Sequence, residues 1–318
     1  MKFLVVGAGA VGGYFGARLA EKGEDVTFLV RAGRQEQLRA KGLVVKSVNG
    51  DTTIRPKTIL SNENGLFDVI LIGTKAYHFE QAIQDIKPFV HSETVIIPML
   101  NGMKHVEHLR EVFPEQCVIG GLCFIESTLS ENGEVIQTSP FHKFMFGEWD
   151  GEKIGRIQAI EQAFTDTNAM ISVSSRILQE MWHKYLFIAT FSGVTTLFGQ
   201  PIGPILELPL GSKLVQELLR EIASIMRAEG APIADNIEEK QFASIGAMAY
   251  EMKSSMQRDM EKGLFVEGDH LQGYLLELGN KHNIQTPVLE TIYANLKLYE
   301  KKVKSETMYI QGNKRTVF

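Results

Sequence analysis

The stretch Phe3-Leu4-Val5-Val6-Gly7-Ala8-Gly9-Ala10-Val11-Gly12 lies at the start of the chain and decides its fold. Its four apolar residues are typical of a buried parallel strand, and the glycines behind them match the pattern Gly-x-Gly-x-x-Gly. In that pattern the first glycine permits a tight turn, the second lets a ligand approach the backbone, and the third lets a helix pack on the strand. The sequence therefore predicts a strand, a turn and a helix N-terminus suited to the pyrophosphate of a dinucleotide.

The first half of the chain continues this alternation of strand and helix. Further apolar runs that are typical of buried strands span residues 26–30, 68–72 and 94–97. The segments between them are long enough for helices, for example at 12–22 and 79–89. Alternation of this kind predicts an α/β fold with a doubly wound parallel sheet of the Rossmann type. Asn49-Gly50 and Asn132-Gly133, each beside a β-prone segment, predict two hairpins.

From about Arg176 onward, helical spacing replaces these strand signals. Apolar residues recur three and four apart at Leu271, Tyr274, Leu275 and Leu278, and again at Leu289, Ile292, Tyr293 and Leu296. A chain of 318 residues also exceeds the usual size of a single hydrophobic core. We therefore expect a Rossmann-type dinucleotide-binding domain over residues 1–175 and an all-helical domain over residues 176–318.

Composition excludes several classes of protein. Hydrophobic residues make up 44% of the chain and charged residues 22%, as in ordinary globular proteins. A net charge of −5 argues against nucleic acid as a partner. Residues 185–206 carry no charge and are long enough to cross a bilayer, but their hydroxyl, proline and glycine content favours a buried core helix followed by a turn. We expect no membrane span.

The cysteines and histidines point to a reduced protein without a metal. Cys117 and Cys123 are the two cysteines, and neither they nor the eight histidines show the spacing of metal ligands. Met1-Lys2 leads directly into a short apolar strand, which is too short for a signal peptide. The expectation is a cytoplasmic protein with no metal site.

The end of the second predicted strand distinguishes NAD from NADP. NAD sites commonly place an acidic residue there, where it binds the ribose hydroxyls. This chain has Arg31, 24 residues after Gly7, and residues 31–46 hold five basic residues, Arg34 among them, and one acidic residue. An arginine can stack on adenine and bind the 2′-phosphate. We therefore predict NADP (NADPH) as the cofactor, with a solvated basic surface as the plainer alternative.

Several separate motifs, in the right order, show a family resemblance. Besides the 7–12 fingerprint and Arg31, they are Gly73-Thr74-Lys75-Ala76, Asn101-Gly102-Met103, Glu180-Met181-Trp182-His183-Lys184, Ser254-Ser255-Met256-Gln257-Arg258-Asp259 and Glu267-Gly268-Asp269. On these motifs the sequence resembles the ketopantoate reductase (2-dehydropantoate 2-reductase) family over nearly its whole length. The resemblance implies NADPH-dependent reduction of a small 2-keto acid, with ketopantoate to pantoate in pantothenate biosynthesis as the named reaction. A homodimer is the expected assembly.

The resemblance also implies roles for individual residues. Lys184 corresponds to the general acid, Glu267 borders substrate and cofactor, Ser255 helps to hold the substrate carboxylate, and Asn101 contacts cofactor and substrate. These roles are chemically sensible, since reduction of a ketone builds negative charge on oxygen that an ammonium can stabilise and protonate. Lys75 and Asn101 each follow a predicted parallel strand, at the edge where such sheets bind ligands. A surface lysine or a helix cap is the plainer alternative for each position.

The sequence also departs from the family. Positions that commonly hold asparagine there are Ile188, Ser192, Ile202 and Met252 here. Ile188 and Ser192 follow Lys184 by one and two helical turns, so they share its face, and Ser192 is a candidate substrate contact. Much of the polar lining for a hydroxylated keto acid is therefore missing.

Three hypotheses follow from these motifs. The first is a ketopantoate reductase, the second a related reductase for a less polar keto acid or carbonyl compound, and the third a non-catalytic NADP-binding sensor. The missing asparagines favour the second. Retention of the residues that match the family's functional positions, Lys184, Asn101, Ser255 and Glu267, argues against the third.

Overall fold

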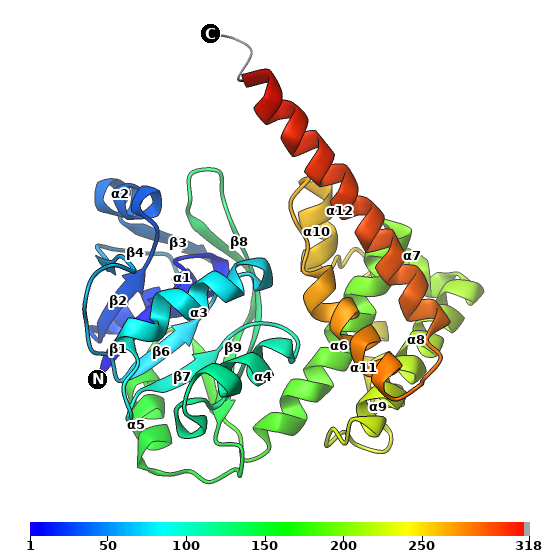
Figure 1. Cartoon of the computed structure of the whole chain (residues 1–318), viewed down its shortest axis with the longest axis horizontal. Helices are drawn as coiled ribbons and strands as arrows, with labels where there is room; N and C mark the ends of the chain where they lie inside the picture. Colours follow the sequence, from blue (N-terminus) through cyan, green and yellow to red (C-terminus); the bar gives the residue numbers. More distant parts are fainter. Residues whose placement is uncertain (315–318) are drawn as a thin grey trace. The chain divides into compact units, whose positions relative to one another are not determined.

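The computed structural model describes the backbone of residues 1–314 and the side chains of residues 1–305. The chain divides into two compact units, Met1–Met181 and Trp182–Phe318. The boundary between the units falls inside helix α6 (Ile177–Phe198), whereas the sequence placed a domain boundary directly before that helix. The first unit is drawn in blue to green in Figure 1, and the second in green to red.

A five-stranded sheet in the order β5-β2-β1-β6-β7 forms the centre of the first unit, and all its pairings are parallel. Its strands are β1 (Lys2–Val6), β2 (Asp25–Leu29), β5 (Lys57–Ile59), β6 (Val69–Ile72) and β7 (Val95–Pro98). Four helices accompany it: α1 (Ala10–Lys22), α2 (Ala32–Lys41), α3 (Phe79–Ile86) and α4 (Lys104–Val112). The predicted Rossmann-type α/β fold is confirmed.

A second five-stranded sheet contains both predicted hairpins. It consists of β3 (Leu43–Ser47), β4 (Thr52–Ile54), β8 (Gly120–Leu129), β9 (Val135–Gly147) and β10 (Met170–Val173), with α5 (Gly155–Phe164) before its last strand. The β3–β4 and β8–β9 pairs are antiparallel and turn at the two Asn-Gly dipeptides, as expected. We did not predict from the sequence that the two hairpins form one sheet. Their joining depends on parallel pairing of β9 with β3 and β10, between residues that are far apart in the sequence.

Helix α1 packs against strands of both sheets, and this creates two apolar cores. Phe3 and Val5 of β1 belong to the core that also contains α1, whereas Leu4 and Val6 belong to the core beneath α3 and α4. Successive strand residues point to opposite faces, so an unbroken apolar strand is required where both faces are covered. The first unit is thus layered as second sheet, α1, first sheet, and α3 with α4 (Figure 1).

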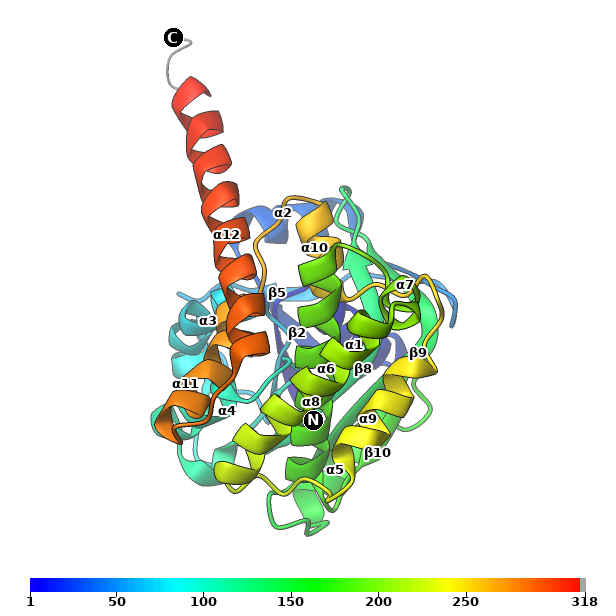
Figure 2. The same ribbon diagram turned by 90° about the vertical axis from the view of Figure 1, so that its right-hand side faces the viewer.

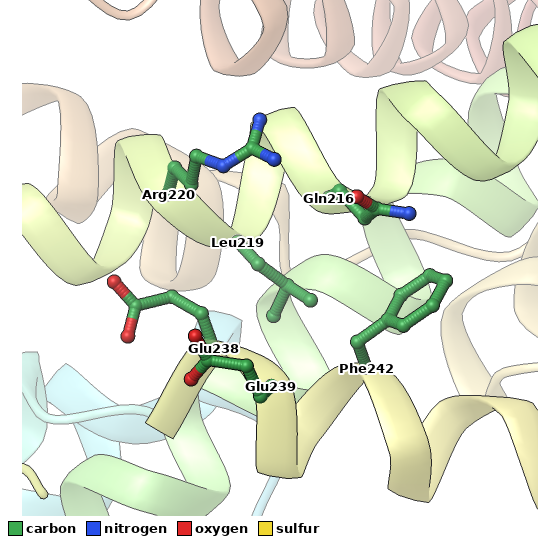
Figure 3. A pocket seen from close by; sticks show the side chains of 6 residues that line it. All are labelled: Gln216, Leu219, Arg220, Glu238, Glu239 and Phe242. Atoms are coloured by element: carbon green, nitrogen blue, oxygen red, sulfur yellow. The ribbon is translucent and has the colours of Figure 1, made fainter. Parts of the chain in front are cut away.

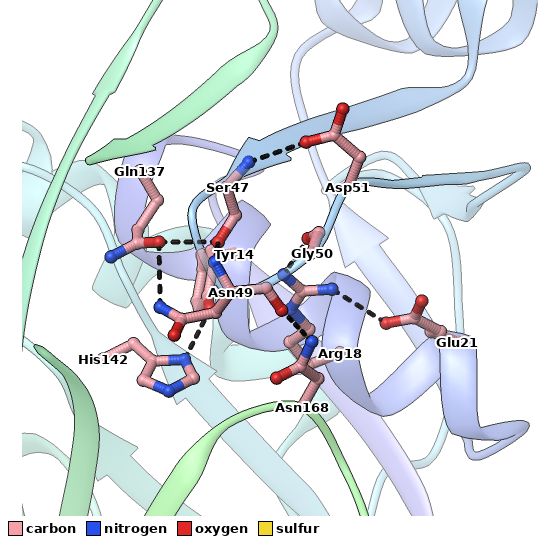
Figure 4. A network of polar contacts seen from close by, with 10 residues as sticks. All are labelled: Tyr14, Arg18, Glu21, Ser47, Asn49, Gly50, Asp51, Gln137, His142 and Asn168. Atoms are coloured by element: carbon pink, nitrogen blue, oxygen red, sulfur yellow. Dashed lines mark hydrogen bonds and ion pairs between the residues drawn. The ribbon is translucent and has the colours of Figure 1, made fainter. Parts of the chain in front are cut away.

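A buried polar network connects α1 to the second sheet (Figure 4). Arg18 is 1% exposed and donates a 2.6 Å hydrogen bond to the carbonyl of Gly50, in the turn of the β3–β4 hairpin. Its guanidinium lies 5.0 Å from the centre of the Tyr14 ring, and the Tyr14 hydroxyl is hydrogen-bonded to Nδ1 of His142 at 2.6 Å. Burial, helped by the charge of Arg18, lowers the pKa of His142.

The described residues of the second unit form helices joined by turns and loops, with no strand, as predicted (Figure 2). After α6 it contains α7 (Ile202–Glu207), α8 (Pro209–Ala228), α9 (Ile237–Gly246), α10 (Ser255–Glu261), the short π-helix η4 (Asp269–Gly273), α11 (Tyr274–Lys281) and α12 (Pro287–Lys314). Glu221 of α8 accepts hydrogen bonds from the first-turn N–H groups of Val288 and Leu289, which joins α8 to the start of α12.

The uncharged segment at 185–206 folds as the expected buried helix followed by a turn. It comprises most of α6 and the turn into α7, and Tyr185, Leu186 and Ala189 are fully buried. Among the described residues, the search for a helix that is long and apolar enough to cross a membrane finds none.

Candidate functional site

The fingerprint loop occupies the carboxyl end of β1. Gly7 has a φ of +89°, a conformation that favours glycine. A Cβ added at Gly12 would lie 2.3 Å from the carbonyl oxygen of Gly7, so the start of α1 packs on the turn too closely for any side chain. At Gly9, by contrast, the nearest described heavy atom would be 4.0 Å away. The loop is therefore packed at its third glycine and open at its second, as backbone binding of a pyrophosphate requires.

Three polar side chains follow the neighbouring strands at the same sheet edge. Thr74 and Lys75 come after β6, where Lys75 begins a 3₁₀ turn (Ala76–His78), and Asn101 comes after β7. Because β1, β6 and β7 are adjacent and parallel, these residues share one edge with the fingerprint loop. The Thr74 hydroxyl is buried and has no hydrogen-bond partner in the described part of the chain, and its side chain lies beside Gly7. A polar ligand at this edge would supply the hydrogen bond that the Thr74 hydroxyl lacks, so these residues fit a dinucleotide.

Arg31 lies at the same edge. It precedes α2 in an extended conformation and its side chain is exposed. Burial and the positive charge of Arg31 together lower the pKa of His78, which ends the 3₁₀ turn behind Lys75. Arg31 follows β2, which pairs in parallel with β1, so it stands at the same edge of the sheet as the fingerprint loop. The predicted cofactor residues of the first unit all follow strands at this edge of the first sheet: 7–12, Arg31, Lys75 and Asn101.

Arg34, which belongs to the same basic segment, has a different setting. It is half-buried and donates hydrogen bonds to the carbonyl oxygens of Ala8 (3.0 Å) and Gly133 (2.9 Å). Burial lowers the pKa of its guanidinium. A second carbonyl of the fingerprint is also bonded, since the Ser127 hydroxyl donates to the carbonyl of Ala10 at 3.0 Å. Sequence reasoning missed both contacts, because they depend on where the β8–β9 hairpin lies in space.

Helix α6 carries the predicted catalytic lysine in the second unit. Lys184 is 7% exposed, which is unusual for a lysine and is typical of a functional position. Ile188 and Ser192 occupy the next two turns of its face, as predicted. Ser192 accepts a 3.0 Å hydrogen bond from the side-chain amide of Gln272, and that amide also donates to the carbonyl of Ala189. No sequence motif pointed to Gln272, which is one buried polar residue on a helical face.

Ser255 and Glu267 lie on segments that are tied to α6. Ser254 caps α10 by accepting the N–H of Gln257, and its hydroxyl also accepts a 2.8 Å hydrogen bond from Thr195 of α6. Ser255 follows directly and is exposed. Glu267 precedes the π-helix that carries Gln272, and short π-helices are frequent at functional sites. The predicted residues of the second unit thus lie on α6 and on two segments bonded to it.

Two further features bear on ligands. Among the described residues, no group of three histidine, cysteine or acidic side chains is arranged to hold a metal ion. A pocket of about 110 Å³ lies between α8 and α9 (Figure 3). Its lining residues are Gln216, Leu219, Arg220, Glu238, Glu239 and Phe242. None of the predicted site residues contributes to it.

A parallel sheet with a glycine fingerprint at its carboxyl edge is the arrangement by which many dinucleotide-dependent oxidoreductases bind their cofactor. The chain belongs to the ketopantoate reductase PanE/ApbA family. The family model matches residues 3–151, and the model for the family's C-terminal part matches residues 176–300.

Individual relatives agree with this assignment. An uncharacterized oxidoreductase of Bacillus subtilis (strain 168), YkpB, is 52% identical over 300 residues, which cover 94% of this chain and 99% of that protein. The crystal structure of a 2-dehydropantoate 2-reductase from Geobacter metallireducens GS-15 is 30% identical, with a TM-score of 0.84 and coverage of 94% and 99%.

A third relative shares the fold alone. D-mandelate dehydrogenase, in a ternary structure with NADH and anilino(oxo)acetate, is 19% identical with a TM-score of 0.86, and the match covers 96% of this chain and 99% of that one. Membership of the ketopantoate reductase family makes the protein an oxidoreductase of keto acids that uses a nicotinamide cofactor.

Proposed function

We propose that the protein reduces a 2-keto acid to the 2-hydroxy acid with NADPH, and that its substrate is ketopantoate, reduced to pantoate for pantothenate biosynthesis. The observation that carries the proposal is Lys184, a lysine 7% exposed on the helix where the family places its general acid. Burial of a lysine is costly unless its charge is used, and a developing alkoxide is such a use.

The two domains have different tasks in this proposal. Residues 1–175 bind the dinucleotide, which supplies a hydride to carbon 2 of the keto acid. Lys184, in residues 176–318, donates a proton to the former ketone oxygen, so one hydride and one proton give the hydroxyl group. Ser255 binds the carboxylate, while Asn101 and Glu267 orient substrate and cofactor. Ser192 is a further substrate contact.

NADPH rather than NADH is proposed because of Arg31. Its side chain is exposed at the sheet edge that carries the fingerprint, where an NAD site would have a carboxylate. A guanidinium there can bind the 2′-phosphate and would leave NADH without an equivalent partner.

The test is oxidation of NADPH by the purified protein against a panel of 2-keto acids that includes ketopantoate. A kcat/KM of about 10⁴ M⁻¹s⁻¹ or more on ketopantoate, within the range of enzymes on their own substrates, would support the named substrate. A higher value on a keto acid without a hydroxyl group would support a related reductase instead. Dinucleotide binding without turnover of any keto acid would favour the non-catalytic sensor.

The second candidate, a reductase of a less polar keto acid, is favoured by the side chains that share a face of α6 with Lys184. Ile188 offers no hydrogen bond, and the Ser192 hydroxyl already accepts one from Gln272. An asparagine at either position would present both a donor and an acceptor to a hydroxylated substrate. The panel therefore needs matched acids with and without the terminal hydroxyl.

The proposal also includes the assembly and the compartment. We propose a homodimeric cytoplasmic enzyme whose partner is the keto acid. Sedimentation equilibrium of the purified protein measures the first of these directly, and a monomer at micromolar concentration would contradict it.

A further inference from the structure

Two carbonyl groups of the fingerprint loop are held by side chains from elsewhere in the first unit. Arg34 of α2 donates to the carbonyl of Ala8, and Ser127 of β8 donates to the carbonyl of Ala10. A trans peptide is planar, so its C=O and the following N–H point in opposite directions. Fixing these two carbonyls therefore fixes the directions of the N–H groups of Gly9 and Val11.

Those N–H directions matter for an anionic ligand. A loop binds phosphate by presenting N–H groups to it, whereas a carbonyl turned to the same side would repel the charge. The peptide between Ala8 and Gly9 is prone to such a reversal, since glycine accepts backbone conformations that other residues avoid. In the structure the space in front of Gly9 is open, and the Ala8 carbonyl is bonded to Arg34.

Arg34 is itself held in place by the β8–β9 hairpin. Its guanidinium also donates to the carbonyl of Gly133 at the hairpin tip and to the side chain of Gln37. Gln37 in turn donates a 2.8 Å hydrogen bond to the carbonyl of Asn132. The hairpin, α2 and the fingerprint loop thus form one hydrogen-bonded assembly, in which one terminal nitrogen of Arg34 donates to two backbone carbonyls and the other donates to Gln37.

We infer that Arg34 is a positioning residue that fixes the phosphate-binding loop, with Ser127 as a second such residue, and that selection of the 2′-phosphate is left to Arg31. The inference rests on the proposed function in that the ligand of the loop is a nicotinamide dinucleotide and that Arg31 binds its 2′-phosphate. It predicts a clear division between two arginines of the same basic segment. Loss of Arg34 harms the binding of any dinucleotide, and loss of Arg31 harms the binding of NADPH.

The experiment is titration calorimetry of NADPH and NADH into the unmodified protein, Arg34→Ala and Arg31→Ala. A lost hydrogen bond from a charged donor corresponds to about a tenfold weaker affinity or more. For Arg34→Ala we expect that loss for both dinucleotides, so that the ratio of the two affinities stays unchanged. For Arg31→Ala we expect the loss for NADPH and little change for NADH.

Three further variants separate positioning from folding. Gln37→Ala breaks the contact of α2 with Asn132 and removes one partner of Arg34 but leaves both loop carbonyls bonded, so it should weaken both dinucleotides by a smaller factor than Arg34→Ala. Arg34→Lys retains the charge and enough donors for one carbonyl, and should give intermediate affinity. Ser127→Ala removes a neutral hydrogen bond and should weaken both dinucleotides by a smaller factor than Arg34→Ala. Thermal unfolding of each variant shows that it is folded at the titration temperature.

The outcomes are distinct. A loss confined to NADPH in Arg34→Ala would overturn the inference and place Arg34 on the 2′-phosphate. Unchanged affinities in Arg34→Ala would also overturn it while leaving the proposed function intact. If Arg34→Ala does not fold, full affinity in both Arg34→Lys and Ser127→Ala would overturn it, and graded losses in those two would support it. Absence of dinucleotide binding by the unmodified protein would contradict the proposed function and this inference with it.

Discussion

In the proposed function, the fingerprint loop of the first unit and the Lys184 face of the second recognise their ligands by different means. At the loop the recognition is made by the backbone: a positive φ at Gly7, a close approach at Gly12 and open space at Gly9. On α6 it is made by side chains that project from one helix face, at Lys184, Ile188 and Ser192. Single substitutions can change a side-chain face without disturbing the fold, whereas the loop tolerates few. The first region therefore defines the ligand class, and the second leaves the substrate to be determined.

Removal of the ammonium at Lys184 should have the largest effect. We predict that Lys184→Ala lowers kcat by about 10² to 10⁴, the usual contribution of general acid catalysis. NADPH affinity should change little, because the proposed dinucleotide-binding residues, 7–12, Arg31, Lys75 and Asn101, lie in the first unit. Steady-state rates and calorimetry measure the two quantities. A variant with near-normal turnover on its best keto acid would remove Lys184 from the mechanism.

Restoration of the family's asparagines tests the other side of the comparison. If the second candidate function holds, the unmodified protein should reduce ketopantoate only weakly, because two missing hydrogen bonds to a desolvated substrate cost roughly 2–6 kcal/mol. The double variant Ile188→Asn with Ser192→Asn should raise kcat/KM for ketopantoate by about 30-fold or more. Efficient ketopantoate reduction by the unmodified protein would instead show that other groups already supply those bonds.

The close backbone packing of the fingerprint loop can be tested by a substitution at Gly12. An added Cβ would lie 2.3 Å from the Gly7 carbonyl, so Gly12→Ala should lower the free energy of unfolding by about 1–3 kcal/mol, as overpacking does. Gly33→Ala in α2 is the matched control, since its added Cβ would have no described heavy atom within 4 Å. Urea unfolding compares the two variants. Equal stabilities would mean that the close approach at Gly12 relaxes without cost.

The parts of the fold and site that could be predicted from the sequence are those set by local geometry. The first sheet and the loop were predictable because apolar runs and glycine spacing reflect local geometry. The second sheet was not, since β9 pairs in parallel with β3 and β10, which are distant in sequence. The sequence does not distinguish the roles of Arg31 and Arg34. They differ because Arg34 bonds the carbonyls of Ala8 and of Gly133 at the hairpin tip, whose position depends on the fold. The amide of Gln272 at Ser192 depends in the same way on long-range packing.

A smaller effect on stability is expected from pH, through His142 in the buried polar network that connects α1 to the second sheet. The pKa of His142 is lowered in the folded chain, whereas in the unfolded chain it is about 6.5. The unfolded state therefore binds more protons below that pH, and stability should fall as pH drops from about 6.5 towards the folded pKa, by at most about 1.4 kcal/mol per pH unit. His142→Gln should have a shallower dependence in urea unfolding. The same slope in both proteins would assign it to other groups.

Transfer of deuterium tests the central claim, that this is an NADPH-dependent 2-keto acid reductase, most directly. NADPH that carries deuterium at the transferred position is incubated with the protein and its best keto acid, and the product is analysed by mass spectrometry and NMR. The account predicts a 2-hydroxy acid with deuterium on carbon 2, and little product when NADH replaces NADPH at the same concentration. Failure of every keto acid in the panel to consume NADPH, or a product without deuterium at carbon 2, would contradict it.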